Sequence, residues 1–157
     1  MLKDPKHSNN IITHPAHYIE GRAFEPITVI EEFGLCHHLA CVVKYIARAG
    51  RKTSLLNDLK KAEWYLDRGL QCCSAGVNSC LIPLGVRPLF SIQEILEDWN
   101  LTANLDTALS YILAARLGTL KKDFCNNKTL GYYTSSLQKS LKHLRLAISE
   151  CEQGERQ

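Results

Sequence analysis

Four basic residues lie within nine positions of the sequence, at Lys44, Arg48, Arg51 and Lys52. Lys44 and Arg48 are four residues apart, so on a helix their side chains leave the same face and can hold one ligand together. Gly50 turns the chain and carries the next two cations towards the start of a following helix, where backbone N–H groups also favour an anion. A guanidinium binds phosphate through two hydrogen bonds and an ammonium binds it as a point charge. The pattern predicts a phosphate-binding site whose cations face water.

Three helices in the first part of the chain are expected to position this cluster. Apolar residues at helical spacing, with proline, glycine or serine at the ends, predict helices over residues 26–34, 39–50 and 54–70. Lys44 and Arg48 fall on the second of these helices, away from its apolar stripe. Residues 1–22 have no periodicity and predict an extended N-terminal arm, whose end carries His17 and Tyr18.

The second part of the chain is predicted to contain three more helices. Residues 71–89 break every periodic pattern and are interpreted as a linker. After the linker, Ser91 and Glu94 have the spacing of a capping box at a helix start. Two further apolar stripes predict the remaining helices, up to Cys151, with a polar loop over about 121–132 between them.

The two parts of the chain are similar to each other. Placing Phe24 on Phe90 aligns the segment VIEEFGL with ILEDWNL and needs no gap through the next helix. The third helices align after an insertion in the second copy, which places Lys61 on Lys139. We therefore predict an all-α bundle of two tandem three-helix repeats that pack on each other as an intrachain pseudo-dimer, since each is too small to bury a core alone. The predicted repeats cover residues 23–70 and 90–151.

The two copies differ at the cationic cluster. Lys44 corresponds to Ser110 and Arg48 to Ala114, and the basic pair after Gly50 has no clear basic counterpart. Since the core positions agree between the copies, the fold does not require these cations. We accordingly expect Arg48→Ala to change the stability of the free protein by no more than about 0.5 kcal/mol.

The composition excludes several classes of protein. A net charge of +3 in 157 residues is small for a protein that coats nucleic acid, so nucleic acid is not the expected partner. No apolar run reaches the roughly 20 residues that span a bilayer, and the N-terminus lacks the apolar core of a signal peptide. We therefore expect a cytoplasmic protein with no membrane partner, whose seven cysteines are reduced thiols. The sequence leaves open whether the chain forms a homo-oligomer.

Three blocks of the first repeat resemble a known family. They are His17-Tyr18, then KYIARAGRK at 44–52, then DLKKAEWYL at 58–66. In this order they resemble the signature of the SaV-like family of small phage proteins, which includes the nucleotide kinase of short-tailed coliphages. The resemblance covers about residues 15–70, with about 90–150 as a degenerate second copy. The polar residues that match recurrent positions are His17, Tyr18, Lys44, Arg48, Lys52, Asp58 and Lys61.

The resemblance implies a nucleotide-binding domain with kinase-like activity. A nucleoside monophosphate kinase holds two polyanions and usually Mg²⁺, but the chain contains no G-x-x-x-x-G-K-[ST] loop, so such a kinase is not a P-loop enzyme. In this interpretation the cations neutralise the transferred phosphate, Asp58 or Glu63 is the polar or Mg²⁺ anchor, and Tyr18 or Trp64 stacks on the base. No residue is assigned as catalytic, and a second complete site is not expected.

The sequence also contains features of three other classes of protein. A binding module would sequester or sense a nucleotide without turning it over. A MazG-like nucleotide pyrophosphohydrolase would need clustered carboxylates for Mg²⁺, for which the candidates are Glu31, Glu32, Glu63 and Asp67. Cysteines and histidines around residues 36–41 are zinc-ligand types, but Cys41 shares the helix face of Lys44, whose charge opposes a metal cation. No zinc is expected.

Overall fold

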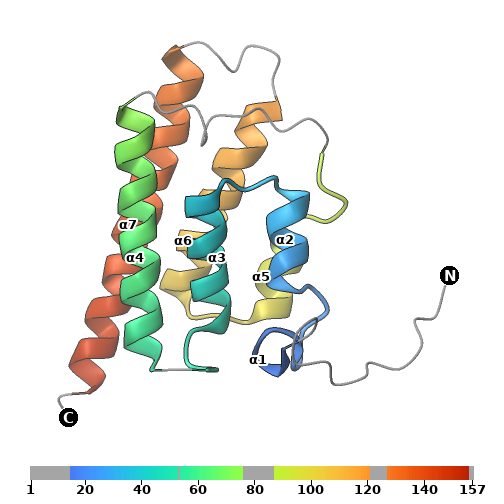
Figure 1. Ribbon diagram of the computed structural model, residues 1–157, viewed down its shortest axis with the longest axis vertical. Helices are drawn as coiled ribbons and strands as arrows, with labels where there is room; N and C mark the ends of the chain where they lie inside the picture. Colours follow the sequence, from blue (N-terminus) through green and yellow to red (C-terminus); the bar gives the residue numbers. More distant parts are fainter. Residues whose placement is uncertain (1–14, 53, 76–86, 121–126, 156–157) are drawn as a thin grey trace, which may run out of the picture.

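The computed structural model describes residues 15–52, 54–75, 87–120 and 127–155, and within these ranges the chain is helical without a strand (Figure 1). The helices are α1 (Ala16–Ile19), α2 (Pro26–Glu32), α3 (His37–Arg48), α4 (Leu55–Ser74), α5 (Ile92–Trp99), α6 (Ala103–Leu117), the short 3-10 helix η2 (Gly118–Leu120) and α7 (Asn127–Gly154). The all-α prediction is confirmed. In the described ranges, no helix combines the length and the apolar character needed to cross a membrane.

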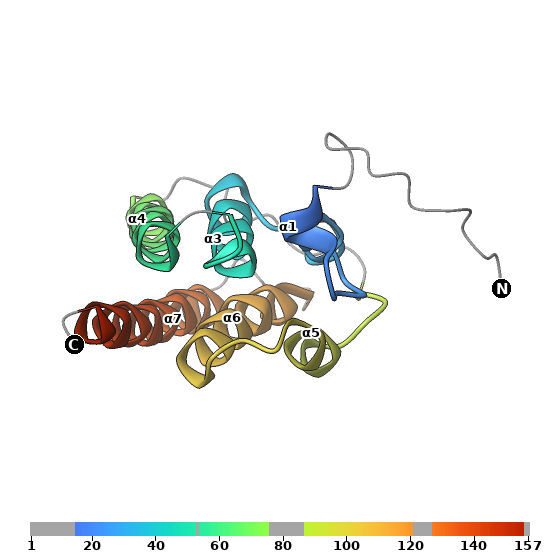
Figure 2. The same cartoon turned by 90° about the horizontal axis from the view of Figure 1, so that it is seen from below.

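The main helices form two layers. Figure 2 shows α3 beside α4 in one layer and α6 between α7 and α5 in the other. Within the layers α2 contacts α3 and α5 contacts α6, and across the layers α3 contacts α6 and α4 contacts α7. Each layer therefore holds a short, a medium and a long helix in chain order.

Local capping signals define several helix ends as the sequence indicates. The Ser54 hydroxyl accepts a hydrogen bond from the Asn57 N–H at 3.3 Å, which begins α4. Ser91 and Glu94 form the predicted capping box of α5, and Asn100 ends that helix in the left-handed conformation with φ of 45°. These bonds satisfy backbone groups that a helix terminus leaves unpaired.

Three helices extend beyond the predicted limits. The end of the predicted arm forms the single turn of α1, α4 continues into the segment interpreted as a linker, and α7 begins inside the predicted loop. Cys73 is buried in the extension of α4, so tertiary packing prolongs a helix whose local sequence gives only weak signals there. Residues 1–14, 76–86 and 121–126, which include other parts of the predicted arm, linker and loop, lie outside the described residues.

The hydrophobic core lies between the two layers and draws on both. At several positions that the alignment pairs, one in each half, both residues are buried. Examples are Ile46 and Ile112, and Leu59 and Leu137. Burying these side chains removes most of their apolar surface from water, which is the main stabilising contribution to such a bundle. The agreement accounts for the similar apolar patterns of the two halves.

A buried arginine joins the second half of the chain to the end of α2. Arg116 on α6 is 3% exposed, and its Nε donates to the Phe33 carbonyl at 3.1 Å while its Nη2 donates to the Gly34 carbonyl at 2.8 Å. On the same side of the molecule, the Trp99 indole N–H donates to the Phe24 carbonyl at 2.9 Å. These bonds hold the two ends of α2 in place against the second layer.

We predict that Arg116→Ala lowers the free energy of unfolding by about 2–4 kcal/mol, because a buried and a partly buried carbonyl lose their charged donor. Urea denaturation followed by circular dichroism measures the change. Arg145→Ala is the matched control, since Arg145 forms an ion pair at the surface and its removal is expected to cost less than about 1 kcal/mol. Equal effects of the two substitutions would contradict a structural role of Arg116.

Candidate functional site

Three of the five predicted cations gather around one tyrosine ring. Tyr45 lies on α3, and its ring centroid is 4.7 Å from the Lys44 ammonium, 4.6 Å from the Arg48 guanidinium carbon and 5.7 Å from the Lys61 ammonium. All three distances fall within the range of cation–π attraction. Lys61 belongs to α4, so the packing of α3 against α4 assembles a cluster that neither helix provides alone. We call Lys44, Tyr45, Arg48 and Lys61 the tyrosine–cation cluster.

Beneath this cluster lies a buried ion pair. The Arg48 Nη2 donates to Asp58 Oδ1 at 2.9 Å, and the side chains of Arg48 and Asp58 are 12% and 0% exposed. Lys61, which is 48% exposed, has its ammonium 4.0 Å from the same oxygen. Burial lowers the pKa of Arg48, but the hydrogen bonds and charges of Asp58 and Tyr18 outweigh burial and raise this pKa above its ordinary value.

The expectation that Arg48 faces water is wrong. Asp58 occupies the first turn of α4, where the helix dipole favours its charge but the neighbouring α3 excludes solvent. A buried carboxylate requires a charged partner, and Arg48 supplies it from the end of α3. Among the described residues, Arg48 Nε and Asp58 Oδ2 are buried without a hydrogen-bond partner, so the pair retains unused polar atoms.

The short helix α1 brings the predicted His-Tyr block to this ion pair. Tyr18 lies close enough to Arg48 to help raise the pKa of its guanidinium, and the ring centroids of His17 and Tyr18 lie 4.2 Å apart. Burial, followed by the charges of Lys52 and Arg48, lowers the pKa of His17 below its ordinary value, while Asp58 acts in the opposite sense. Residues from the three sequence blocks therefore meet at one place.

Arg51 takes a different position from the other predicted cations. Its Nη1 donates to the Glu20 carbonyl at 2.7 Å, which ties the turn after α3 to the end of α1. Burial, followed by the charge of Arg51, lowers the pKa of Arg22 to about 10, although Asp98 opposes the shift. Arg51 thus contacts the arm that carries His17 and Tyr18, and contributes to the site by holding this arm.

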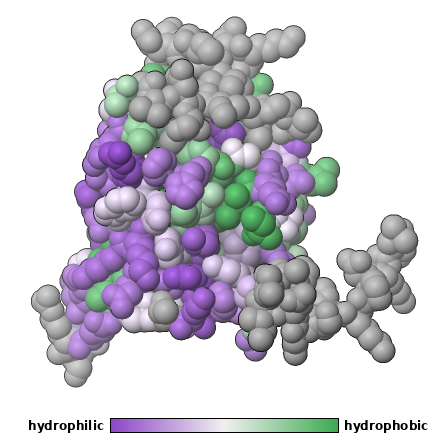
Figure 3. Space-filling model, viewed as in Figure 1, coloured by the Kyte–Doolittle hydropathy of each residue, from purple (hydrophilic) through white to green (hydrophobic). Residues whose placement is uncertain are grey.

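A small recess opens beside the cluster, between the arm, α2 and α3. Its volume is about 270 Å³, and its lining residues are Pro15, Tyr18, Glu25, Pro26, Ile27, Ile30 and Lys44. Figure 3 shows hydrophobic surface in the middle of this face, between α2 and α3, with hydrophilic surface over the α4 side. The sequence did not predict the recess, because the helical spacing of apolar residues over 26–34 does not indicate that Ile27 is left 52% exposed.

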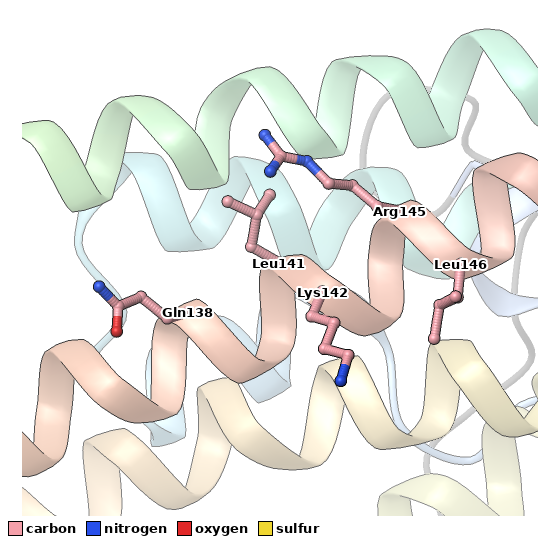
Figure 4. Close-up of a pocket in the computed structure, with 5 residues that line it drawn as sticks. All are labelled: Gln138, Leu141, Lys142, Arg145 and Leu146. Carbon is pink, nitrogen blue, oxygen red and sulfur yellow. The ribbon is translucent and has the colours of Figure 1, made fainter.

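Glu63, the second predicted anchor, is engaged elsewhere. It accepts a hydrogen bond from Arg145 Nε at 2.7 Å, and Figure 4 shows Arg145 directed from α7 towards α4. The cavity of about 420 Å³ drawn in this figure is lined by residues of α7 alone, namely Gln138, Leu141, Lys142, Arg145 and Leu146. It is a groove on the surface of one helix and shares no lining residue with the tyrosine–cation cluster.

The other metal-ligand candidates are dispersed. Glu32 accepts from the Leu89 N–H, and Asp67 accepts from the Gln71 amide. The Cys41 Sγ lies 3.9 Å from the His37 Nε2, so two side chains of the types that bind zinc lie next to each other. In the part of the chain that the structure describes, no three His, Cys, Asp or Glu side chains form a group that could hold a metal ion. In the described part of the chain, the cysteines form no disulfide; they are Cys36, Cys41, Cys72, Cys73 and Cys151.

The second half contains a matching arrangement of rings and lysine. Tyr45 stacks on Tyr65 with centroids 5.8 Å apart and 23° between the planes. At the aligned positions, Tyr111 stacks on His143 at 6.1 Å and 27°, and the Lys139 ammonium lies 5.6 Å from the Tyr111 ring. The arginine and aspartate of the buried ion pair align with alanine and serine in this half.

Comparison with known proteins finds a match to the first half of the chain only. A family described as a protein of unknown function, DUF3310, matches residues 12–67, which extend from the arm into α4. No curated protein and no solved structure matches the chain. The matched span agrees with the predicted location of the recognisable blocks at about 15–70, while the SaV-like assignment and the second copy stay predictions.

We predict that Arg48→Ala destabilises the fold by about 3–5 kcal/mol, in contrast to the expectation from sequence, because Asp58 would stay buried without its partner. The double substitution Arg48→Met with Asp58→Leu should recover most of this loss, since it removes both charges. Urea denaturation of the single and double variants measures the coupling. A cost below about 1 kcal/mol for Arg48→Ala would contradict this structural role.

We predict that His17 titrates below its ordinary pKa of 6.5 in the free protein, because burial and neighbouring cations disfavour the imidazolium. Since the unfolded chain then takes up the proton more readily, His17 lowers the stability as the pH falls below about 6.5. Lys52→Ala should raise the pKa of His17 partway towards 6.5. NMR titration of the imidazole signals measures both values, and a His17 pKa above 6.5 would contradict the proposed surroundings.

Proposed function

We propose that this chain binds a phosphorylated small molecule, specifically a nucleotide, at the tyrosine–cation cluster. The observation that carries the proposal is the charge balance around Tyr45. Lys44, Arg48 and Lys61 surround this ring, and the ion pairs found for these cations in the described residues all involve Asp58. A cluster with several cations and one carboxylate is unfavourable on its own and gains stability when an anion joins it.

The proposed phosphate position lies at the outer ends of Lys44 and Lys61. Lys61 is about half exposed, and Lys44 borders the recess, so both ammonium groups are accessible to a ligand. Arg48 forms the floor of the site, because its guanidinium is mostly buried against Asp58. His17 and Lys52 lie close to each other, on the arm and on the turn after α3. The charge of Lys52 favours an anion there, whereas His17, whose pKa is lowered, offers a ring nitrogen for hydrogen bonding.

Phosphoryl transfer is the catalytic form of this proposal and rests on the resemblance to the SaV-like family. Mg²⁺ would arrive with the phosphates of the nucleotide, as it does in many phosphoryl-transfer sites. Asp58 is poorly suited to hold Mg²⁺ directly, since its side chain is fully buried and both Arg48 and Lys61 lie against its Oδ1. A binding module that leaves the nucleotide intact uses the same contacts, and measurement of turnover separates the two functions.

The pyrophosphohydrolase alternative has less support. Its candidate carboxylates Glu32, Glu63 and Asp67 have separate partners in the described structure. A two-metal or multi-carboxylate site requires such groups to converge within a few ångströms. We therefore do not extend the proposal to pyrophosphate hydrolysis.

We also infer that the two layers are copies of one unit arranged as an intrachain pseudo-dimer. The equivalent ring stacks and lysine positions around Tyr45 and Tyr111 support this inference beyond the apolar pattern. In the second copy, Ala114 and Ser136 replace the buried ion pair. The first copy is therefore the one proposed to bind the nucleotide.

We predict that pyrophosphate and nucleoside mono- and triphosphates raise the melting temperature of the protein, measured by differential scanning fluorimetry at low salt with and without Mg²⁺. Lys44→Ala and Lys61→Ala should each weaken binding about 5- to 20-fold, because each removes one cation from the phosphate position. Chromatography of the same mixtures detects turnover.

Lys139→Ala is the matched control for Lys61→Ala, since Lys139 holds the aligned position over Tyr111. It should leave the ligand affinity unchanged. Absence of any ligand-induced shift in the wild-type protein, or equal loss of affinity in the Lys61 and Lys139 variants, would contradict the proposed site.

A further inference from the structure

We infer that the base of the bound nucleotide stacks on Trp64, an exposed ring on α4. This inference rests on the proposed function. Trp64 is 61% exposed, whereas Trp99 is 2% exposed and belongs to the core. An exposed tryptophan has a large apolar face that water solvates poorly, and a planar ligand ring covers such a face well. A stacking role also requires that Trp64 lie close to the proposed phosphate position.

An unbroken series of aromatic contacts joins Trp64 to the tyrosine–cation cluster. The Trp64 and Tyr65 rings meet edge to face with centroids 4.9 Å apart, and Tyr65 in turn stacks on Tyr45. The edge-to-face contact restrains the indole, so a ligand ring that binds to it loses less entropy than on a freely rotating side chain. The exposed indole thus lies two rings away from the cations.

The position of Lys61 on α4 also places Trp64 close to the proposed phosphate position. Lys60 forms an ion pair with Glu152, and Glu63 forms one with Arg145. Lys61 precedes Trp64 by three residues, so the two side chains leave neighbouring positions on the helix surface. Helical side chains lean towards the N-terminus, which directs the indole back over the turn that carries Lys61. A phosphate on Lys61 therefore leaves the rest of the ligand close to Trp64.

This geometry specifies the ligand class and its selectivity. Stacking on an aromatic face requires a planar ring and accepts any base, because every base has a π-face. The proposed site should thus accept purine and pyrimidine nucleotides, with purines bound somewhat more tightly because their rings are larger. The aligned position in the second half is Lys142, which lacks a ring, so the platform accompanies the cations in the first half alone.

The test compares adenosine 5′-monophosphate with pyrophosphate. Trp64→Ala should weaken the binding of the nucleotide about 5- to 100-fold and change the binding of pyrophosphate less than about twofold, since only the nucleotide has a base to stack. Trp64→Phe should retain most of the nucleotide affinity. In the wild-type protein, the nucleotide should protect Trp64 from fluorescence quenching by acrylamide, whereas pyrophosphate should not. Trp99 contributes little to this signal because it is buried.

Tyr132→Ala is the control for loss of an exposed aromatic residue, since Tyr132 is 51% exposed on α7, and it should change neither affinity. If neither ligand binds the wild-type protein, the proposed function fails and this inference fails with it. If both bind but Trp64→Ala weakens neither, or weakens both equally, only the stacking inference is overturned. It is also overturned if Ile27→Asp in the recess weakens nucleotide binding selectively while Trp64→Ala does not, because the base then occupies the recess.

Discussion

The charge of Asp58 is buried where α4 begins, and the arrangement of the surrounding residues follows from the requirement to pair it. A carboxylate removed from water needs an opposite charge and good hydrogen bonds. Arg48 reaches it from the end of α3, and in doing so its guanidinium lies against the Tyr45 ring and within hydrogen-bond reach of Tyr18. One ion pair therefore links α3, α4 and the arm, and sets the geometry in which Lys44 and Lys61 remain accessible.

Residue types and spacing were sufficient to predict the all-α fold, the helix order and several caps, because these depend on local periodicity and on backbone groups at helix ends. They did not predict the burial of Arg48. A helical face opposite the main apolar stripe is expected to be solvated, and only the contact between α3 and α4 brings Asp58 beneath it. Likewise, the Arg116 bonds to the end of α2 join residues more than eighty positions apart, which no local pattern can indicate.

The aromatic residues show the same limit. The sequence indicated no separate role for Tyr45 and gave Trp64 only as one of two candidates for base stacking, whereas the structure has Tyr45 half-buried among cations and Trp64 largely exposed. A single sequence gives the spacing of an aromatic residue but not the exposure of its ring, because exposure depends on which neighbouring helix covers it. In contrast, the membership of the cluster was largely predicted, since the three blocks carry their polar residues on segments that the fold brings together.

The comparison between the two halves distinguishes the features that support the helical bundle from the features that the bundle does not require. The ring stack and the lysine over it occur in both halves, so they are compatible with a purely structural role in packing the medium helix against the long one. The buried ion pair, Lys44 and the exposed indole occur only in the first half, where they concentrate charge and apolar surface beside each other. Such a combination costs stability in a free protein through like-charge repulsion and poor hydration. A ligand that is both anionic and planar would relieve both costs at once, which is the physical reason to propose a nucleotide as the ligand of this half.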